Sequence, residues 1–314
     1  MVGLPGRERL FAWWKMSRPS QLLLILVVYA IGVGAGTSRG GSFDLTRTAV
    51  GAVALVPLAA SVHYVNEYAD VETDAITERT RFSGGSGALV VTGLPAETAL
   101  RAAVTALAVG TVTTGAALSV GAVTARGVGL LVVVVVLGWA YSVGPRLVAR
   151  GLGEVTNALL GGLVLPLFGV AVARGPLDAV AVLAFLPFTV YVFANLLATQ
   201  WPDRRADEKT GKRTLPTRWS TTGLRWAHWL TTGTTFAMFG LFPLVDLLPR
   251  VVGWGCLLLT PAGIVASHRF TRVTSPFPSV ATMVGLAVVQ LFTWALLVLA
   301  RGGQRFYPPA VLGV

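Results

Sequence analysis

Residues 66–87 read NEYADVETDAITERTRFSGGSG, an acidic and then glycine-rich segment that directly follows an apolar run. The segment holds five of the chain's 14 acidic residues: Glu67, Asp70, Glu72, Asp74 and Glu78. Asn66, Asp70 and Asp74 are four residues apart, so on a helix they lie one turn apart on the same face. Three oxygen ligands on one face favour a hard divalent cation, and a solvated acidic loop is the alternative.

The composition is typical of a membrane protein. Hydrophobic residues make up 54% of the chain and charged residues 12%, and the mean hydropathy is +0.70. A soluble domain needs about a quarter of its residues charged. The single cysteine, Cys256, lies in an apolar run, which excludes a disulfide and a thiolate metal site. The net charge of +11 comes without a basic patch interleaved with aromatic residues, so the expected partner is the lipid bilayer and no nucleic acid is expected.

Nine apolar runs, each near the roughly 20 residues that a bilayer core requires, predict an all-α polytopic membrane protein. The runs cover residues 21–36, 48–65, 98–120, 127–142, 155–173, 177–201, 221–244, 250–267 and 279–300. Residues 1–18 are basic and contain Phe11, Trp13 and Trp14, which predicts a lead that lies along the membrane interface. We expect residues 1–314 to form a single domain.

The basic residues orient the spans. With the N-terminus inside, 18 of the 25 lysines and arginines lie in inner segments. The positive-inside rule therefore predicts a multi-pass protein of the cell membrane whose N-terminus and longer connections, 66–97 and 202–220, are cytoplasmic. These two connections also hold most of the acidic residues, which membrane topology does not require.

A second acidic cluster lies in residues 203–214, DRRADEKTGKRT, again at the end of a span. Asp203 and Asp207 repeat the spacing of four residues, and basic residues surround them: Arg204, Arg205, Lys209, Lys212 and Arg213. Carboxylates hold Mg²⁺, the metal binds phosphate oxygens, and lysine or arginine offsets the remaining charge. The two clusters together therefore predict a site for an anion bridged by metal. Two charged helix ends that face lipid headgroups are the alternative.

Three segments resemble the UbiA superfamily of intramembrane prenyltransferases. NEYADVETD (66–74) is similar to the first aspartate-rich motif of that family, and DRRADEKTGKRTL (203–215) is similar to the second. YSVGPRLVARGLGE (141–154) resembles the segment after the fourth span. The resemblance covers nearly the whole chain. It is closest to the branch that acts on 1,4-dihydroxy-2-naphthoate, in which GKRT follows the second aspartate pair.

The resemblance implies two Mg²⁺ ions and a helix bundle around a central apolar cavity. The implied ligands of the first ion are Asn66, Asp70 and Asp74, and those of the second are Asp203 and Asp207; the four aspartates are the expected catalytic residues. The residues expected to bind diphosphate are Arg81, Arg146, Lys212 and Arg213. The residues expected at the substrate pocket are Arg18, His63, Tyr68, Tyr141 and Asn195. Glu67 and Glu72 are expected to take no part in metal binding or catalysis.

The chain departs from the family pattern at three places. Glu67 stands where an aspartate is common. Thr199 stands where an asparagine often precedes the second aspartate pair by four residues, and Asn195 lies one helical turn further back. The family also has a lysine four residues after a tyrosine, whereas Pro145 follows Tyr141 and the nearest cation is Arg146. These departures affect the expected role of Tyr141 more than they affect the metal sites.

The expected reaction transfers a polyprenyl group from its diphosphate to an aromatic acceptor like 1,4-dihydroxy-2-naphthoate, as in the biosynthesis of menaquinone, another quinone or a related lipid. A glyceryl phosphate lipid or a carotenoid acceptor would use the same chemistry. A divalent cation transporter is a more remote alternative. Such a transporter would carry carboxylates near the membrane midplane, whereas both acidic clusters of this chain lie at the ends of spans. A CDP-alcohol phosphotransferase also uses paired aspartates, but its Asp-Gly…Ala-Arg run is absent ahead of Asp74 and Asp207.

Overall fold

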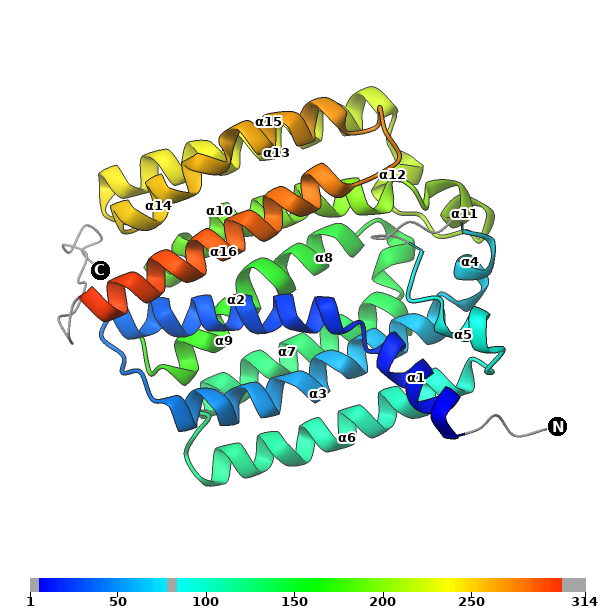
Figure 1. Ribbon diagram of the computed structural model, residues 1–314, viewed down its shortest axis with the longest axis horizontal. Coiled ribbons are helices and arrows are strands. Elements are labelled where there is room, and N and C mark those ends of the chain that lie inside the picture. The colour runs from blue at the N-terminus through cyan, green and yellow to red at the C-terminus, as the bar shows by residue number, and fades with distance from the viewer. Residues whose placement is uncertain (1–5, 78–83, 301–314) are drawn as a thin grey trace.

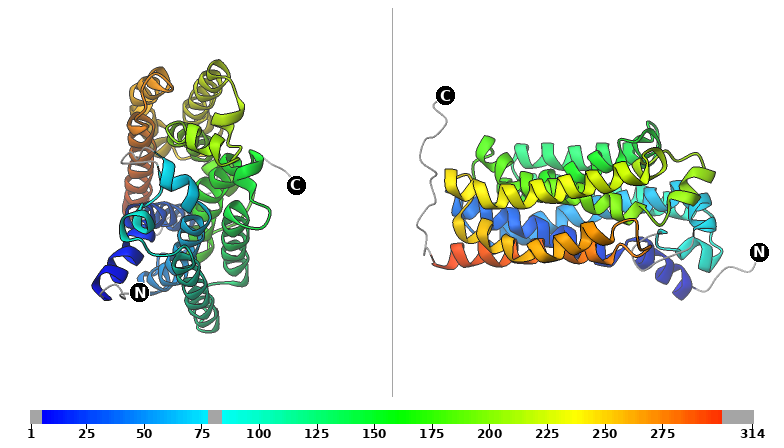
Figure 2. Two further views of the ribbon diagram at one scale, coloured as in Figure 1. Left: turned by 90° about the vertical axis from the view of Figure 1, so that its right-hand side faces the viewer. Right: turned by 90° about the horizontal axis from the view of Figure 1, so that it is seen from above.

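The computed structural model describes residues 6–77 and 84–300, and every regular element in these two ranges is a helix. The long helices run side by side along the longest axis of the molecule (Figures 1 and 2). Eight helical units are long and apolar enough to cross a membrane. They are α2 (Pro19–Ser38), α3 (Leu45–Ala69), α6 (Glu97–Ser119), α7 (Ala125–Ser142), Gly153–Val172, α10 (Ala179–Gln200), Arg250–Arg269 and α16 (Phe277–Ala300). The prediction of an all-α membrane bundle is confirmed.

The ninth predicted span is α13 (Thr221–Leu241), which is long enough to cross a bilayer but less apolar than the other eight. Its polar residues include His228, which is fully buried. The two ring nitrogens of His228 lie 2.9 Å from Ser267 Oγ and 3.0 Å from Ser279 Oγ. Because these hydrogen bonds reach α15 and α16, the polar side of α13 faces its neighbouring helices.

Two of the spanning units are interrupted, and a proline explains each break. The first consists of α8 (Gly153–Leu159), the π-helical turn η2 (Leu160–Val164) and α9 (Leu165–Val172). The second consists of α14 (Arg250–Cys256), the 3₁₀ turn η4 (Leu257–Leu259) and α15 (Thr260–Arg269). Pro166 and Pro261 have no N–H to donate to the carbonyl four residues earlier, and their rings clash with it. Those carbonyls belong to residues 162 and 257, which lie within the irregular turns.

Side-chain caps define where four of the long helices begin. In each case an oxygen of the capping residue accepts the backbone N–H three residues later, at distances of 2.8–3.1 Å. The caps of α3, α7, α10 and α13 are Asp44, Thr124, Asp178 and Ser220. Each cap satisfies a backbone donor that has no partner within its helix.

Helices α2 and α9 approach each other closely because glycines line their interface. A Cβ atom added to Gly32 would lie 1.9 Å from the carbonyl oxygen of Pro166. One added to Gly169 would lie 2.2 Å from the carbonyl oxygen of Tyr29. Small residues permit such contacts between membrane helices, where van der Waals packing drives association.

The short helices gather at one end of the bundle, opposite the C-terminal end of α16 (Figure 1). They are α1 (Gly6–Met16), α4 (Val71–Ile76), α5 (Ala88–Thr92), α11 (Arg204–Lys209) and α12 (Leu215–Arg218). Two 3₁₀ turns, η1 (Leu147–Arg150) and η3 (Phe242–Val245), complete the helical elements of the described ranges. Both acid-rich segments therefore lie at the same end of the molecule.

Helix α1 has one buried face and one exposed face. It buries Ala12 and Met16 in a small apolar cluster with Leu89 of α5. Trp13 and Trp14 on the same helix are exposed, at 43% and 66%. Tryptophans beside cations favour the headgroup layer, so this exposed face suits the membrane surface.

The glycine contact between α2 and α9 yields a stability prediction. Gly32→Ala should lower the melting temperature of the detergent-solubilised protein, because overpacking at this backbone contact costs about 1–3 kcal/mol. Gly233→Ala is the matched control, since a Cβ atom there meets nothing within 4 Å. Circular dichroism melts of the two variants and the wild type measure the effect, and equal melting temperatures would contradict it.

Candidate active site

The first cluster lies where α3 meets α4. Asn66 is in the last turn of α3, Asp70 separates the two helices and Asp74 is in α4. The Asp70 N–H donates to the Asn66 carbonyl at 2.9 Å, and the Asp74 N–H donates to the Asp70 carbonyl at 2.8 Å. The three residues are thus one turn apart, as their spacing predicts. Asn66 Nδ2 also donates to Asp70 Oδ2 at 2.9 Å.

The second cluster lies at the start of α11 and is reached by the glycine-rich loop of the first. Asp203 precedes α11, and its Oδ2 accepts the Gly84 N–H at 3.2 Å. Asp207 is within α11 and is 2% exposed. Thr214 Oγ1 donates to Asp207 Oδ2 at 3.4 Å.

Lys212 joins the two clusters. Its Nζ atom lies 2.9 Å from both carboxylate oxygens of Asp70 and 3.9 Å from Asp207 Oδ1. A second contact lies nearby, where the hydroxyls of Thr73 and Thr210 are 3.0 Å apart. Segments more than 130 residues apart in the chain therefore form one site at the end of the bundle where α4 and α11 lie (Figure 1).

Burial raises the pKa of two carboxyl groups of the site, those of Asp74 and Asp207. Burial, followed by the charges of Glu67 and Asp70, raises the pKa of Asp74 to about 7. Burial also raises the pKa of Asp207 to about 7, although the positive charge of Lys212 lowers that pKa. Burial lowers the pKa of Lys212, but the nearby Asp70 and Asp207 carboxylates outweigh it and raise that pKa above its ordinary value. The site therefore has an excess of acidic groups that favours added positive charge.

Glu67 has a structural role that the sequence did not suggest. It is 2% exposed and accepts hydrogen bonds from Arg18 Nε at 2.9 Å and Nη2 at 2.6 Å. It also accepts the Ser86 N–H at 2.9 Å and the Ser86 hydroxyl at 2.5 Å. Arg18 Nη2 in turn donates to Asn66 Oδ1 at 2.8 Å. Glu67 thus holds the segment before α2 and the glycine-rich loop against α3.

The expected pocket residues lie on several sides of the clusters. His63 Nδ1 donates to the Ser17 carbonyl at 2.7 Å, beside Arg18. Tyr68 packs into the apolar cluster beneath α1. Tyr141 lies at the end of α7, with its ring against Gly153. Asn195 of α10 is 5% exposed, and its Oδ1 atom has no hydrogen-bond partner within residues 6–77 and 84–300.

The four expected diphosphate-binding residues differ in their placement. Lys212 lies inside the site, as described above. Arg146 and Arg213 are exposed. Arg81 lies outside the described residues.

Two further polar residues contact the site. Ser142 Oγ accepts a hydrogen bond from Asn66 Nδ2 at 3.3 Å. Glu154 is fully buried, and its Oε1 accepts the Leu215 N–H at 2.6 Å. The only sequence signal for Glu154 is that it is an isolated acid in an otherwise basic inner connection.

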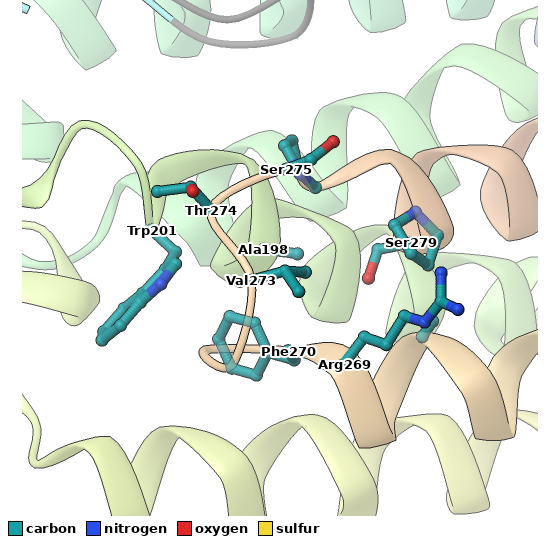
Figure 3. A pocket seen from close by; sticks show the side chains of 11 residues that line it. Ala198, Trp201, Arg269, Phe270, Val273, Thr274, Ser275 and Ser279 are labelled. Atoms are coloured by element: carbon teal, nitrogen blue, oxygen red, sulfur yellow. The ribbon is translucent and has the colours of Figure 1, made fainter. Parts of the chain in front are cut away.

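Two small clefts lie at this end of the molecule. One is lined by Glu67, Val71, Asp74, Gly87, Leu89 and Val90, and it borders the first cluster. The other lies between the end of α10 and the turn from α15 to α16, where Trp201, Phe270 and Ser279 line it (Figure 3). The second cleft contains none of the predicted site residues.

The donor atoms suit a hard divalent cation. They are carboxylate and amide oxygens, and more carboxylates than cations meet at the site. In the described part of the chain, no three His, Cys, Asp or Glu side chains are grouped closely enough to hold a metal by themselves. The Lys212 ammonium instead occupies the position of a cation beside Asp70.

The fold and the site define an integral membrane enzyme of the prenyltransferase class. The model of the UbiA prenyltransferase family matches residues 25–297, and the protein belongs to that family. No curated protein matches the sequence.

Several solved structures share this fold. A UbiA homolog from Archaeoglobus fulgidus bound to GPP and Mg²⁺ has a TM-score of 0.71 and 16% identity, covering 91% of this chain and 99% of its own. An apo UbiA homolog from Aeropyrum pernix K1 has a TM-score of 0.66 and 16% identity, with coverages of 87% and 97%. A digeranylgeranylglyceryl phosphate synthase has a TM-score of 0.62 and 15% identity, with coverages of 93% and 98%. At these identities the likeness establishes the fold.

The Glu67 contacts yield a second prediction. Glu67→Ala should destabilise the protein by about 1.5–3 kcal/mol, because the partly buried Arg18 guanidinium and Ser86 lose a charged hydrogen-bond partner. Hydrogen–deuterium exchange of residues 84–92 should become faster. Glu72→Ala, in the same motif but exposed, is the control and should leave exchange unchanged. Equal exchange in both variants would show that Glu67 does not hold the loop.

Proposed function

We propose that the protein transfers a polyprenyl group from its diphosphate to an aromatic acceptor like 1,4-dihydroxy-2-naphthoate, in the biosynthesis of menaquinone or a related lipid. The observation that carries the proposal is the contact of Lys212 with both Asp70 and Asp207. It brings two carboxylate groups and a cation together at one point, which is the arrangement that a metal-bound diphosphate requires.

Magnesium is the proposed cofactor, with two ions per site. Asn66, Asp70 and Asp74 would hold one ion, and Asp203 and Asp207 would hold the other. The excess of acidic groups and the oxygen donors support this assignment. Related structures were determined with Mg²⁺ and GPP or DMAPP. When bound, Mg²⁺ would neutralise charge on the diphosphate leaving group.

The protein's own cations complete the binding of the diphosphate in this proposal. Lys212 Nζ contacts Asp70 now and can turn its ammonium to a phosphate oxygen when the carboxylate binds metal. Arg146 and Arg213 are exposed at the same end and add charge at longer range. Arg81 is assigned the same role from the sequence alone. Such groups favour cleavage of the bond to the diphosphate because they stabilise the charge that develops there.

The apolar interior of the bundle suits the prenyl chain. Below the second cluster, α10 contributes Ala194 and Leu197, both fully buried. Each buried CH₂ group of an isoprenoid gains roughly 0.8 kcal/mol in such surroundings. An allylic cation formed there is also kept from water until the acceptor attacks it.

The acceptor would bind between the clusters and the bundle interior. The buried Oδ1 atom of Asn195 lacks a partner in the described residues, so it is free to accept a hydrogen bond from a phenolic hydroxyl. Tyr141 is the second proposed contact, since it lies near Lys212 and Asp70. Arg18, His63 and Tyr68 complete the proposed pocket. A glyceryl phosphate lipid or a carotenoid is the alternative acceptor.

The orientation and domain organisation are also part of the proposal. The site lies at the same end as α1, and the positive-inside rule, applied to the basic residues, supports a cytoplasmic position for that end. A single domain over residues 1–314 accords with a family match from 25 to 297.

An activity assay with Mg²⁺ and geranylgeranyl diphosphate tests the proposal. The acceptor panel contains 1,4-dihydroxy-2-naphthoate, a glyceryl phosphate lipid and a carotenoid. We expect prenylation of the naphthoate, loss of activity with EDTA, and recovery with added Mg²⁺. Asp70→Asn and Asp203→Asn should each lower the rate by roughly 100-fold or more, as expected when electrostatic stabilisation of the leaving group is lost.

Glu208→Gln is the matched control, because Glu208 adjoins Asp207 but is exposed. It should retain wild-type activity. Prenylation of another panel member alone would reassign the acceptor. No prenylation and no release of diphosphate with any acceptor would overturn the proposed function.

A further inference from the structure

Glu154, in the first turn of α8, is buried in an unusual way. It is 0% exposed, and within the described residues no lysine or arginine forms an ion pair with it. Burying a carboxylate without a cation is costly, so the group must gain compensating contacts. The contact it makes is with the chain that follows the second cluster, where the Leu215 N–H donates to Glu154 Oε1 at 2.6 Å.

The residues just before Leu215 make the contacts that hold the active site together. Lys212 Nζ reaches Asp70, and the Thr214 hydroxyl donates to Asp207 Oδ2. Leu215 comes next in the sequence, so three contacts anchor residues 212–215. Two of these anchors are carboxylates proposed to bind metal, and Glu154 is the third.

A second contact joins the same two segments. Arg218 Nη1 donates to the Arg150 carbonyl at 3.0 Å. Between Arg150 and Glu154, the chain passes close to Tyr141, because a Cβ atom added to Gly153 would lie 2.9 Å from the Tyr141 ring. The connection from α7 to α8 therefore contacts Tyr141 on one side and α12 on the other. A shift of α8 would thus also shift residues 212–215.

We propose that Glu154 is a positioning residue that fixes residues 212–215, so that Lys212 and Asp207 stay aligned with Asp70. This inference rests on the proposed function, because the aligned groups are those assigned to Mg²⁺ and diphosphate. The role depends on the length of the side chain and on one acceptor atom, Oε1. It does not depend on the negative charge.

Proton acceptance is the competing role for the same side chain. Glu154 Oε2 is buried and has no hydrogen-bond partner within residues 6–77 and 84–300. Two conservative variants separate the roles. Glu154→Gln keeps the length and the Oε1 acceptor but removes the basic carboxylate. Glu154→Asp keeps the carboxylate but withdraws it by one methylene from Leu215.

The experiment compares these variants with the wild type by isothermal titration with GPP in the presence of Mg²⁺ and by hydrogen–deuterium exchange. We expect Glu154→Gln to bind GPP like the wild type. Glu154→Asp should weaken binding roughly five- to tenfold, as the loss of one buried hydrogen bond would do. Exchange of residues 210–218 should accelerate in Glu154→Asp alone.

Asp178→Ala is the matched control at the other end of the bundle. Asp178 pairs at 2.9 Å with Arg39; the Arg39 side chain is 5% exposed and that of Asp178 is 48% exposed, so the variant leaves a buried guanidinium without its carboxylate partner. It should lower the melting temperature but leave GPP binding and the exchange of residues 210–218 unchanged. If it weakens GPP binding as much as Glu154→Asp does, a general loss of stability explains the result and the inference fails.

Two other outcomes would overturn the inference. One is wild-type binding and exchange in Glu154→Asp. The other is a Glu154→Gln protein that binds GPP normally but has lost turnover, which would identify Glu154 as a proton acceptor. A wild-type protein that does not bind GPP would instead refute the proposed function, and the exchange of residues 210–218 would still decide whether Glu154 holds this segment.

Discussion

The bond between Lys212 and Asp70 is the interaction on which the site depends. The two side chains are only 13% and 15% exposed, so water screens their attraction far less than it would at the surface. The same burial raises the pKa values of Asp74 and Asp207, first because it removes their carboxyl groups from water and then because neighbouring carboxylates repel them. The lysine offsets part of this repulsion. A site built in this way gains stability when further positive charge binds, and this property suits a metal-dependent enzyme.

Two buried glutamates hold the loops that lie next to the bond between Lys212 and Asp70. Glu67 accepts hydrogen bonds from Arg18 and Ser86, and Glu154 accepts one from the backbone of Leu215. Each glutamate therefore fixes a loop that contacts the opposite cluster or its lysine. The two glutamates hold loops of the protein through backbone and side-chain donors, whereas the four aspartates are the residues assigned to the charged ligands in the proposed mechanism.

Much of the fold follows from local sequence. The apolar runs predicted the spans because each bilayer crossing needs about 20 apolar residues, and the structure contains a helix for each run. The interruption of two spans also has a local cause in Pro166 and Pro261. The span boundaries were less predictable, since hydropathy does not register a capping side chain. Helix α3, for example, starts at Leu45 after its Asp44 cap, and it extends to Ala69.

The site was predictable only in part, for a physical reason. The spacing of Asn66, Asp70 and Asp74 is local and correctly predicts that they lie one turn apart. The role of Glu67 depends on Arg18, which is 49 residues away, and that of Glu154 depends on Leu215, which is 61 residues away. No periodicity in the sequence encodes such contacts, because they exist only once the helices have packed.

The central claim is that the two acid-rich motifs meet in one site, and a disulfide cross-link tests it most directly. The hydroxyls of Thr73 and Thr210 are 3.0 Å apart, so the double variant Thr73→Cys, Thr210→Cys should oxidise readily in a Cys256→Ala background. A protease site inserted at residues 174–178 would then give two fragments that stay joined until a reductant is added. Fragments that separate without a reductant, after oxidation of the folded protein in membranes, would contradict the account.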